Sequence, residues 1–277
     1  MSLMSKLLMS TIAATVTLSA AVTDKELTKY FKRFIVKNHA VKVTGVEVLD
    51  VRKITEYPGW EAYLTNMKVK FNGKDISAPQ TVFVNGSLMT TGLVDIKTNK
   101  DYGKEFKPKV LATLYDDAHL LFGNRDAKHK VMIFSDPQCP FCIEIVPDIM
   151  NEARLHPETF AVYYYHLPLM RIHPVSEILV RVMHVAQEKG QNNIVEKLYS
   201  LEIDPRETNV DKVLVAVKKH SGFVVTKAEI DAKSVKDAIR EDQAAAAKMM
   251  VSGTPTIFVD GDWDKGREKF KSLIPKK

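Results

Sequence analysis

The chain has 277 residues, of which 45% are hydrophobic and 27% are charged, so it is long enough for one large or two ordinary globular domains. Its formal charge is +6, from 40 Lys and Arg against 34 Asp and Glu, and the basic residues are scattered along the chain. Nucleic-acid-binding proteins usually concentrate their basic charge, so the composition disfavours that class.

Residues 1–21 have the pattern of a secretory signal peptide. Lys6 supplies a positive start, residues 7–18 are apolar or small, and Ser19-Ala20-Ala21 predicts cleavage after Ala21. The alternatives are an amphipathic core helix or a membrane anchor, but an anchor needs about 20 apolar residues and this run is shorter. We therefore expect export to the bacterial periplasm, an oxidising compartment, with no membrane anchor after cleavage.

Residues 22–97 are expected to form a small α+β domain. Thr23 and Glu26 have the spacing of a helix capping box. Apolar residues then recur at helical spacing: Leu27, Tyr30, Phe31, Phe34 and Ile35. Alternating apolar residues follow, with a change of phase at Gly45 that suggests a bulge. Asn72-Gly73 and Asn85-Gly86 predict hairpin turns, giving one helix and about four antiparallel strands.

Residues 98–130 are expected to be a linker. The segment from Asn99 to Lys109 is polar and basic. A helix is predicted over residues 110–122 from the spacing of Leu111, Leu114, Leu120 and Leu121.

Residues 131–277 are expected to form an α/β domain. An apolar strand over residues 131–134 is followed by a helix to about residue 155 and a second strand over 160–165. Residues 174–250 are predicted to be mainly helical. A third strand is expected over 256–259, before a last helix through Phe270, Leu273 and Ile274. This order implies a sheet covered by helices, with a helical insertion.

The chain contains only two cysteines, in the run Cys139-Pro140-Phe141-Cys142. At the start of a helix, free backbone N–H groups and the helix dipole favour a thiolate. Since the thiolate is the attacking species, Cys139 is the expected nucleophile and Cys142 the resolving thiol. Pro140 and Phe141 are expected to tune the reduction potential.

Three other interpretations fit the cysteine pair less well. A structural disulfide would close so short a loop that it would stabilise the fold little. A zinc site would need four ligands, and His129 and His166 do not form a ligand pair, so no metal is expected. Two buried free thiols would suit an oxidising compartment poorly.

Residues 134–142, with the sequence FSDPQCPFC, resemble the active site of the thioredoxin superfamily, and Gly253-Thr254-Pro255-Thr256 resembles its cis-proline loop. The motifs are most similar to those of the periplasmic isomerase and reductase branch, DsbC and DsbG. This resemblance implies a thioredoxin-like fold, a cis bond between Thr254 and Pro255, and substrate binding by that loop. It requires no cofactor beyond the redox-active disulfide.

Further features distinguish a resemblance to the isomerase and reductase branch from a resemblance to the oxidase DsbA. A Thr before the cis-proline resembles the isomerase branch, whereas the oxidase DsbA has Val. Ile133 stands where thioredoxin and the oxidase carry an acid, and Pro147 matches the helix-kinking proline. The N-terminal region resembles the cystatin-like dimerisation domain of DsbC and DsbG, and residues 82–95 fit its end. The Pro-Phe pair leaves the direction of electron flow open.

Several other residues were considered as site candidates. His166 or His173 can approach the cysteines, although an ordinary loop position is the simpler interpretation. Asp136 is expected to be a cap or turn residue, not a catalytic acid. Met249 and Met250 precede the Thr-Pro loop, and either substrate contact or helix packing explains them.

The resemblance implies a V-shaped homodimer joined through the N-terminal domains. Its expected activity is disulfide isomerisation or reduction in exported proteins, with a DsbD-like inner-membrane thiol reductant as electron donor. The alternatives are a dithiol oxidase that introduces disulfides and a redox-independent chaperone.

Overall fold

The structure is a computed structural model that describes residues 22–38 and 40–275. The predicted signal peptide lies outside the described residues. Within these ranges, none of the helices is both long enough and apolar enough to cross a membrane.

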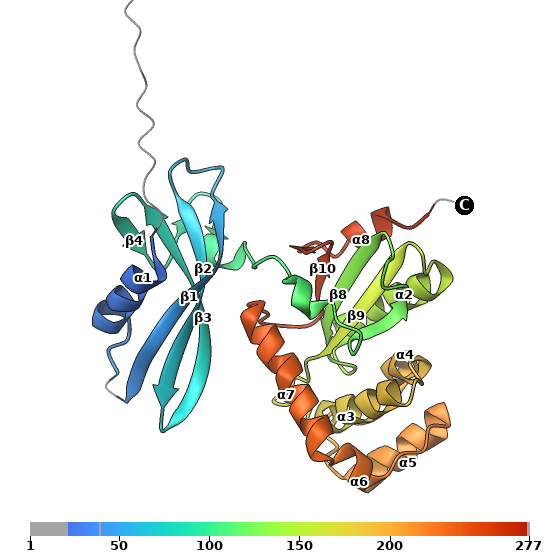
Figure 1. Ribbon diagram of the computed structural model, residues 1–277. Helices are drawn as coiled ribbons and strands as arrows, with labels where there is room; N and C mark the ends of the chain where they lie inside the picture. Colours follow the sequence, from blue (N-terminus) through green and yellow to red (C-terminus); the bar gives the residue numbers. More distant parts are fainter. Residues whose placement is uncertain (1–21, 39, 276–277) are drawn as a thin grey trace, which may run out of the picture.

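A helix packed on a four-stranded antiparallel sheet forms the N-terminal part (Figure 1). Helix α1 (Asp24–Tyr30) continues into a π-helical turn, η1 (Phe31–Ile35). The strands follow the order β1 (Val41–Lys53), β2 (Glu61–Phe71), β3 (Lys74–Asn85) and β4 (Leu88–Thr90). The predicted helix and four strands are confirmed, while the cystatin-like assignment stays a prediction.

Local sequence signals set the ends of these elements. The Thr23 hydroxyl accepts the Glu26 N–H, and the Glu26 carboxylate accepts the Thr23 N–H, so the capping box is confirmed. Asn72 and Gly73 form a two-residue hairpin loop with φ of 48° and 77°, the left-handed conformation that such turns require. The expected irregularity at Gly45 is a shift of register between β1 and β2.

The connection between the two parts corrects one prediction. Two short strands, β5 (Val94–Asp95) and β6 (Lys100–Asp101), pair with each other and lead into the 3₁₀ turn η2 (Tyr102–Lys104). The helix predicted over 110–122 is wrong. Residues Ala112–Leu114 form a single 3₁₀ turn, η3, and Leu120–Gly123 form strand β7. Strand β7 pairs with the edge of the C-terminal sheet, and those backbone hydrogen bonds outweigh the local leucine spacing.

The C-terminal part is a five-stranded mixed sheet of order β11-β10-β8-β9-β7. Strands β8 (His129–Ser135) and β9 (Phe160–His166) are parallel, and β10 (Thr256–Val259) is antiparallel to β8. Strand β11 (Asp262–Trp263) is a short edge that the sequence did not predict. The sheet also includes β7, so it begins within the stretch that was predicted to be linker.

Helices cover both faces of this sheet. Helix α2 (Pro140–Leu155) follows β8, and α8 (Lys269–Ser272) is shorter than the predicted last helix. The insertion is helical, as expected, and comprises α3 (Val175–Glu188), α4 (Asn193–Lys197), the 3₁₀ turn η4 (Leu198–Ser200), α5 (Val210–Ser221), α6 (Lys227–Ile230) and α7 (Lys233–Lys248).

Alternation along β8 divides the core into two layers. Val131 and Ile133 lie in the cluster that includes α2 and α3, whereas Met132 and Phe134 lie in the cluster that includes α7. All four side chains are fully buried. A strand covered on both faces has a continuous apolar run, which explains why this segment lacks polar alternation.

Candidate active site

Strand β8 and helix α2 place Cys139 at their junction. Cys139 is the N-cap residue of α2, with extended backbone angles, and Pro140 occupies the first helical turn. Proline is favoured there because its missing N–H would have no helical partner. The Cys142 N–H donates to the Cys139 carbonyl at 2.9 Å. Both cysteines are free thiols, and Pro147 lies inside α2, as the resemblance implied.

The two thiols have opposite electrostatic surroundings. A hydrogen bond with the Cys142 side chain lowers the pKa of Cys139 to about 5. Burial opposes this shift, and the Phe141 and Cys142 N–H groups support it. Burial, followed by the hydrogen bond with Cys139, raises the pKa of Cys142 far above its ordinary value. Cys139 is therefore largely a thiolate at pH 7, and Cys142 stays protonated.

Residues 253–256 bring the second predicted motif to the first. The Thr254–Pro255 peptide bond is cis, and the Cys139 Sγ lies 3.4 Å from the Thr254 carbonyl oxygen. Pro255 is buried just before β10. The fold thus joins two motifs that are 115 residues apart in the sequence.

Asp136 is a fully buried acceptor that fastens the loop before Cys139. Its Oδ1 accepts the Gln138 N–H at 2.8 Å and the Ser176 hydroxyl at 2.6 Å. Its Oδ2 accepts the Leu169 N–H at 2.7 Å and lies 3.2 Å from His173 Nδ1. The i to i+2 bond to Gln138 supports the turn interpretation, and α2 receives no side-chain cap from it.

The candidate histidines occupy different environments. His173 is tied to Asp136, so it lies near the cysteine loop. His166 is buried, with Nε2 2.8 Å from Gln187 Oε1, and burial lowers its pKa to about 4. A buried neutral imidazole that is held in this way fits the structural interpretation of His166.

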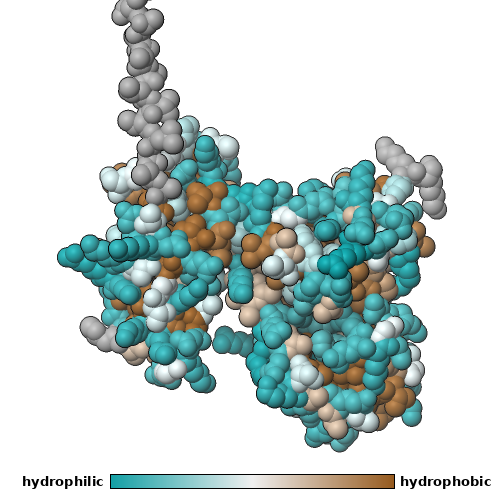
Figure 2. Space-filling model, viewed as in Figure 1, coloured by the Kyte–Doolittle hydropathy of each residue, from teal (hydrophilic) through white to brown (hydrophobic). Residues whose placement is uncertain are grey.

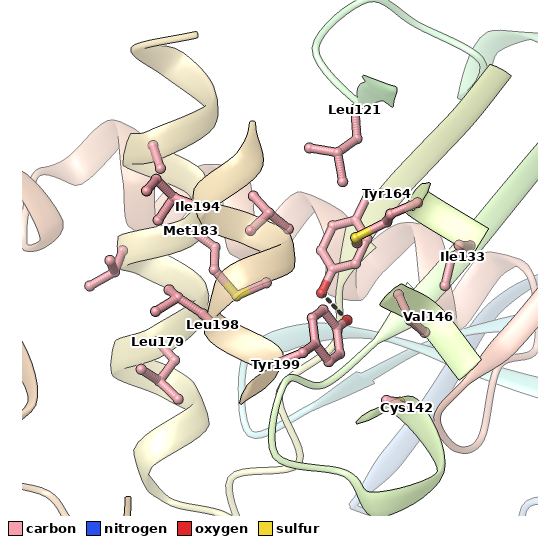
Figure 3. Close-up of a cluster of buried hydrophobic side chains, with 14 of the residues drawn as sticks. Leu121, Ile133, Cys142, Val146, Tyr164, Leu179, Met183, Ile194, Leu198 and Tyr199 are labelled. Carbon is pink, nitrogen blue, oxygen red and sulfur yellow. Dashed lines mark hydrogen bonds between the residues drawn. The ribbon is translucent and has the colours of Figure 1, made fainter. Parts of the chain in front are cut away.

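A chain of buried hydroxyl groups that the sequence does not predict lies beside Cys142. The Tyr199 hydroxyl donates to Ser135 Oγ at 2.6 Å and lies 2.7 Å from the Tyr164 hydroxyl, and Figure 3 shows the two rings within the apolar cluster that contains Cys142. Ser135 in turn forms a hydrogen bond with Cys142 that opposes the rise of the Cys142 pKa. No sequence signal pairs residues from β8, β9 and η4, so only the fold reveals this chain.

Comparisons with known proteins identify a family for the C-terminal part. A family model described as the DSBA-like thioredoxin domain matches residues 130–273. Na(+)/H(+) antiporter NhaA 1 of Mycobacterium sp. (strain KMS) is 29% identical over 154 residues, which are 55% of this chain and 25% of that protein. The chain thus spans about a quarter of the length of the curated relatives it matches.

Two solved structures are also similar. A thioredoxin-like oxidoreductase from Silicibacter pomeroyi DSS-3 is 20% identical, with a TM-score of 0.46, over 54% of this chain and 84% of that chain. BdbD from Bacillus subtilis, in its oxidised form, is 18% identical, with a TM-score of 0.45, over 55% of this chain and 86% of that chain.

Proposed function

This chain belongs to the DSBA-like thioredoxin domain family, and we propose from that premise that it is a thiol–disulfide oxidoreductase acting on exported proteins. The observation that carries the proposal is the Cys139 thiol, whose pKa is lowered to about 5 at the start of α2, 3.4 Å from the carbonyl oxygen of Thr254. Cys142 is the resolving thiol, and Thr254 and Pro255 bind the substrate backbone. Pro140 and Phe141 tune the potential.

The reaction needs only these sulfur atoms. The Cys139 thiolate attacks one sulfur of a substrate disulfide, and the other sulfur leaves as a thiolate. In isomerisation, a substrate thiolate then displaces Cys139, with no net transfer of electrons. In reduction, Cys142 loses its proton to solvent and attacks the Cys139 sulfur of the mixed disulfide. The bond between Cys139 and the substrate breaks and the substrate sulfur leaves as a thiolate, so the protein becomes a disulfide and the substrate gains two electrons.

The preferred activity is disulfide isomerisation or reduction, as in DsbC and DsbG. A Cys139 pKa of about 5 lies between the values of about 3.5 for the oxidase DsbA and about 7 for thioredoxin. A lowered thiol pKa stabilises the reduced form of the cysteine pair. The same lowered pKa is the observation that favours a second candidate, a dithiol oxidase.

Two measurements separate these candidates. The protein should restore activity to a disulfide-scrambled test protein, and Cys139→Ala should reduce that activity to the uncatalysed background. Cysteines that are mostly reduced in cells would support the isomerase, whereas mostly oxidised cysteines would support the oxidase. Equal activity of Cys139→Ala and the unchanged protein would overturn the catalytic assignment.

The same proposal places the mature protein in the periplasm as a homodimer joined through its N-terminal part, with a DsbD-like membrane protein returning electrons to Cys139 and Cys142. Exposed apolar side chains on that part support the homodimer. Leu88 on the edge strand β4 is 65% exposed, and Ile96 between β5 and β6 is 88% exposed.

A further inference from the structure

A pocket of about 630 Å³ lies directly beside the Thr254–Pro255 loop. One wall comes from the connecting segment, with Phe106 and Lys107. The rest of the lining includes the loop itself and Trp263 and Arg267. Thr254, which lines the pocket, also contacts Cys139 through its carbonyl oxygen, so the pocket and the reactive sulfur share a neighbour.

Positive charge dominates this pocket. Its lining includes four cations, Lys104, Lys107, Lys265 and Arg267, against one carboxylate, Asp264. Lys104 and Lys265 are already paired, with Asp101 at 3.2 Å and Glu105 at 2.7 Å. Among the described residues, no carboxylate lies within 4 Å of Lys107 or Arg267. Lys107 and Arg267 are therefore the two cations of the pocket lining that have no ion-pair partner among the described residues.

The chain holds these two cations in place. Lys107 Nζ donates to the Met250 carbonyl at 2.6 Å and lies 4.7 Å from the centroid of the Trp263 ring. Burial lowers the pKa of Lys107 to about 8, so at pH 7 it carries a charge that water no longer fully solvates. The Arg267 guanidinium lies 5.7 Å from the centroid of the Phe141 ring, which connects the pocket to the cysteine motif.

We propose that this pocket binds an acidic segment next to the reactive cysteine of the substrate polypeptide, so that the protein selects substrates by charge. The inference rests on the proposed function and adds the substrate class. A cysteine joined to Cys139 brings its neighbouring residues past Thr254, at about 3.3 Å per extended residue. An Asp or Glu one to three positions away then reaches Lys107 and Arg267, whose partly desolvated charges it neutralises.

Peptide kinetics test this selection. Three peptides carry one cysteine as a mixed disulfide with 2-mercaptoethanol, and they differ only in the two residues on each side, which are Glu, Gln or Lys. We expect the reduced full chain to react about tenfold faster with the Glu peptide than with the Lys peptide at low salt, since charge steering acts at this scale. In about 1 M salt, where screening acts over about 3 Å, the rates should converge.

A double variant assigns the effect to the pocket. Lys107→Gln/Arg267→Gln should bring the Glu-to-Lys rate ratio close to one, while Lys218→Gln/Lys219→Gln, which removes two exposed cations from α5, should keep it. Because the Glu-to-Lys rate ratio is compared, any change that a variant causes in the reactivity of Cys139 itself cancels. Equal rates for the three peptides, or a preference that survives in the pocket variant, would overturn the inference.

Failure of the proposed function is a separate outcome. The same peptides with Ser in place of Cys bind without chemistry, and fluorescence polarisation should show weaker binding for the Lys peptide than for the Glu peptide. Preferential binding without disulfide exchange would refute the oxidoreductase and leave the pocket assignment intact. Exchange without any preference, in kinetics or binding, would refute the pocket and leave the oxidoreductase.

Discussion

Cys139 and Cys142 are chemically identical side chains whose surroundings give them different roles. Cys139 receives hydrogen bonds at a helix start, whereas Cys142 is fully buried in the core shown in Figure 3. In the proposed mechanism, Cys139 is therefore ready to attack, and Cys142 reacts only after a mixed disulfide has formed. The asymmetry comes from position along α2 and not from residue type.

The pH dependence of Cys139 follows from this asymmetry. Attack on a disulfide depends on the thiolate fraction, so its rate should rise about tenfold per pH unit below pH 5 and level off above about pH 6. Ultraviolet absorbance of the thiolate should give the same midpoint, and Cys139→Ala should abolish that transition. A midpoint near the ordinary thiol value of 9.0 would contradict the assignment.

The folded reduced protein should lose stability as the pH falls. The pKa of Cys139 is lower in the folded protein than the ordinary value of 9.0. The stabilisation that the Cys139 thiolate gives to the folded protein is therefore fully present above about pH 9. It is lost as the pH falls through about 5. The oxidised protein lacks this ionisation. As the pH is lowered from about 9 to about 5, the Tm of the reduced protein should therefore fall relative to the Tm of the oxidised protein.

At the scale of elements, Asp136 joins the β8–α2 junction to the loop that leads into α3. Asp136→Ala leaves several buried donors without an acceptor, among them the Leu169 N–H and the Ser176 hydroxyl. We expect the free energy of unfolding, measured in urea, to fall by about 3–5 kcal/mol. The control Asp237→Ala, which breaks ion pairs at the surface, should cost about 1 kcal/mol or less. A small loss for Asp136→Ala would show that the loop is held by other contacts.

The elements that were predictable are those with local causes. Asn72 and Gly73 specify their turn by backbone conformation alone, and the capping box fixes the start of α1. The leucines of β7 fit a helical spacing as well as a strand, so the sequence predicts a helix there. Only the pairing with β9, which supplies the backbone hydrogen bonds, makes this segment a strand. Strand β11 has two residues and exists only through its pairing with β10.

The same distinction applies to the site. The cysteine motif and the Thr254–Pro255 loop were expected because their resemblance to a known family places them together. Tyr199 beside Cys142, and Lys107 beside the cis-proline loop, were not expected. Each depends on side chains from elements far apart in the sequence, and no local pattern marks such a contact.

At the scale of the molecule, polar contacts join the N-terminal sheet to the redox part. The Lys109 N–H donates to Asp50 of β1 at 3.2 Å, and Arg52 of the same strand lies 3.9 Å from Asp262. Helix α7 contacts β3, and Figure 1 shows it beside that strand. Figure 2 shows mainly hydrophilic residues on the viewed face of the molecule, with separate hydrophobic areas. The N-terminal sheet also contributes Pro79 of β3 to the lining of the basic pocket.

We expect the protein to be a homodimer joined through its N-terminal part. Light scattering should give twice the mass of one chain, because the exposed Leu88 on a sheet edge and the exposed Ile96 favour burial against a second copy. Leu88→Glu/Ile96→Glu should reduce the mass to that of one chain, since four charges would then enter the interface of two copies. Val215→Glu/Val224→Glu changes two exposed apolar residues of the helical insertion and should leave the dimer intact. A monomeric unchanged protein would refute the dimer, and dissociation by the second pair would place the interface on the insertion.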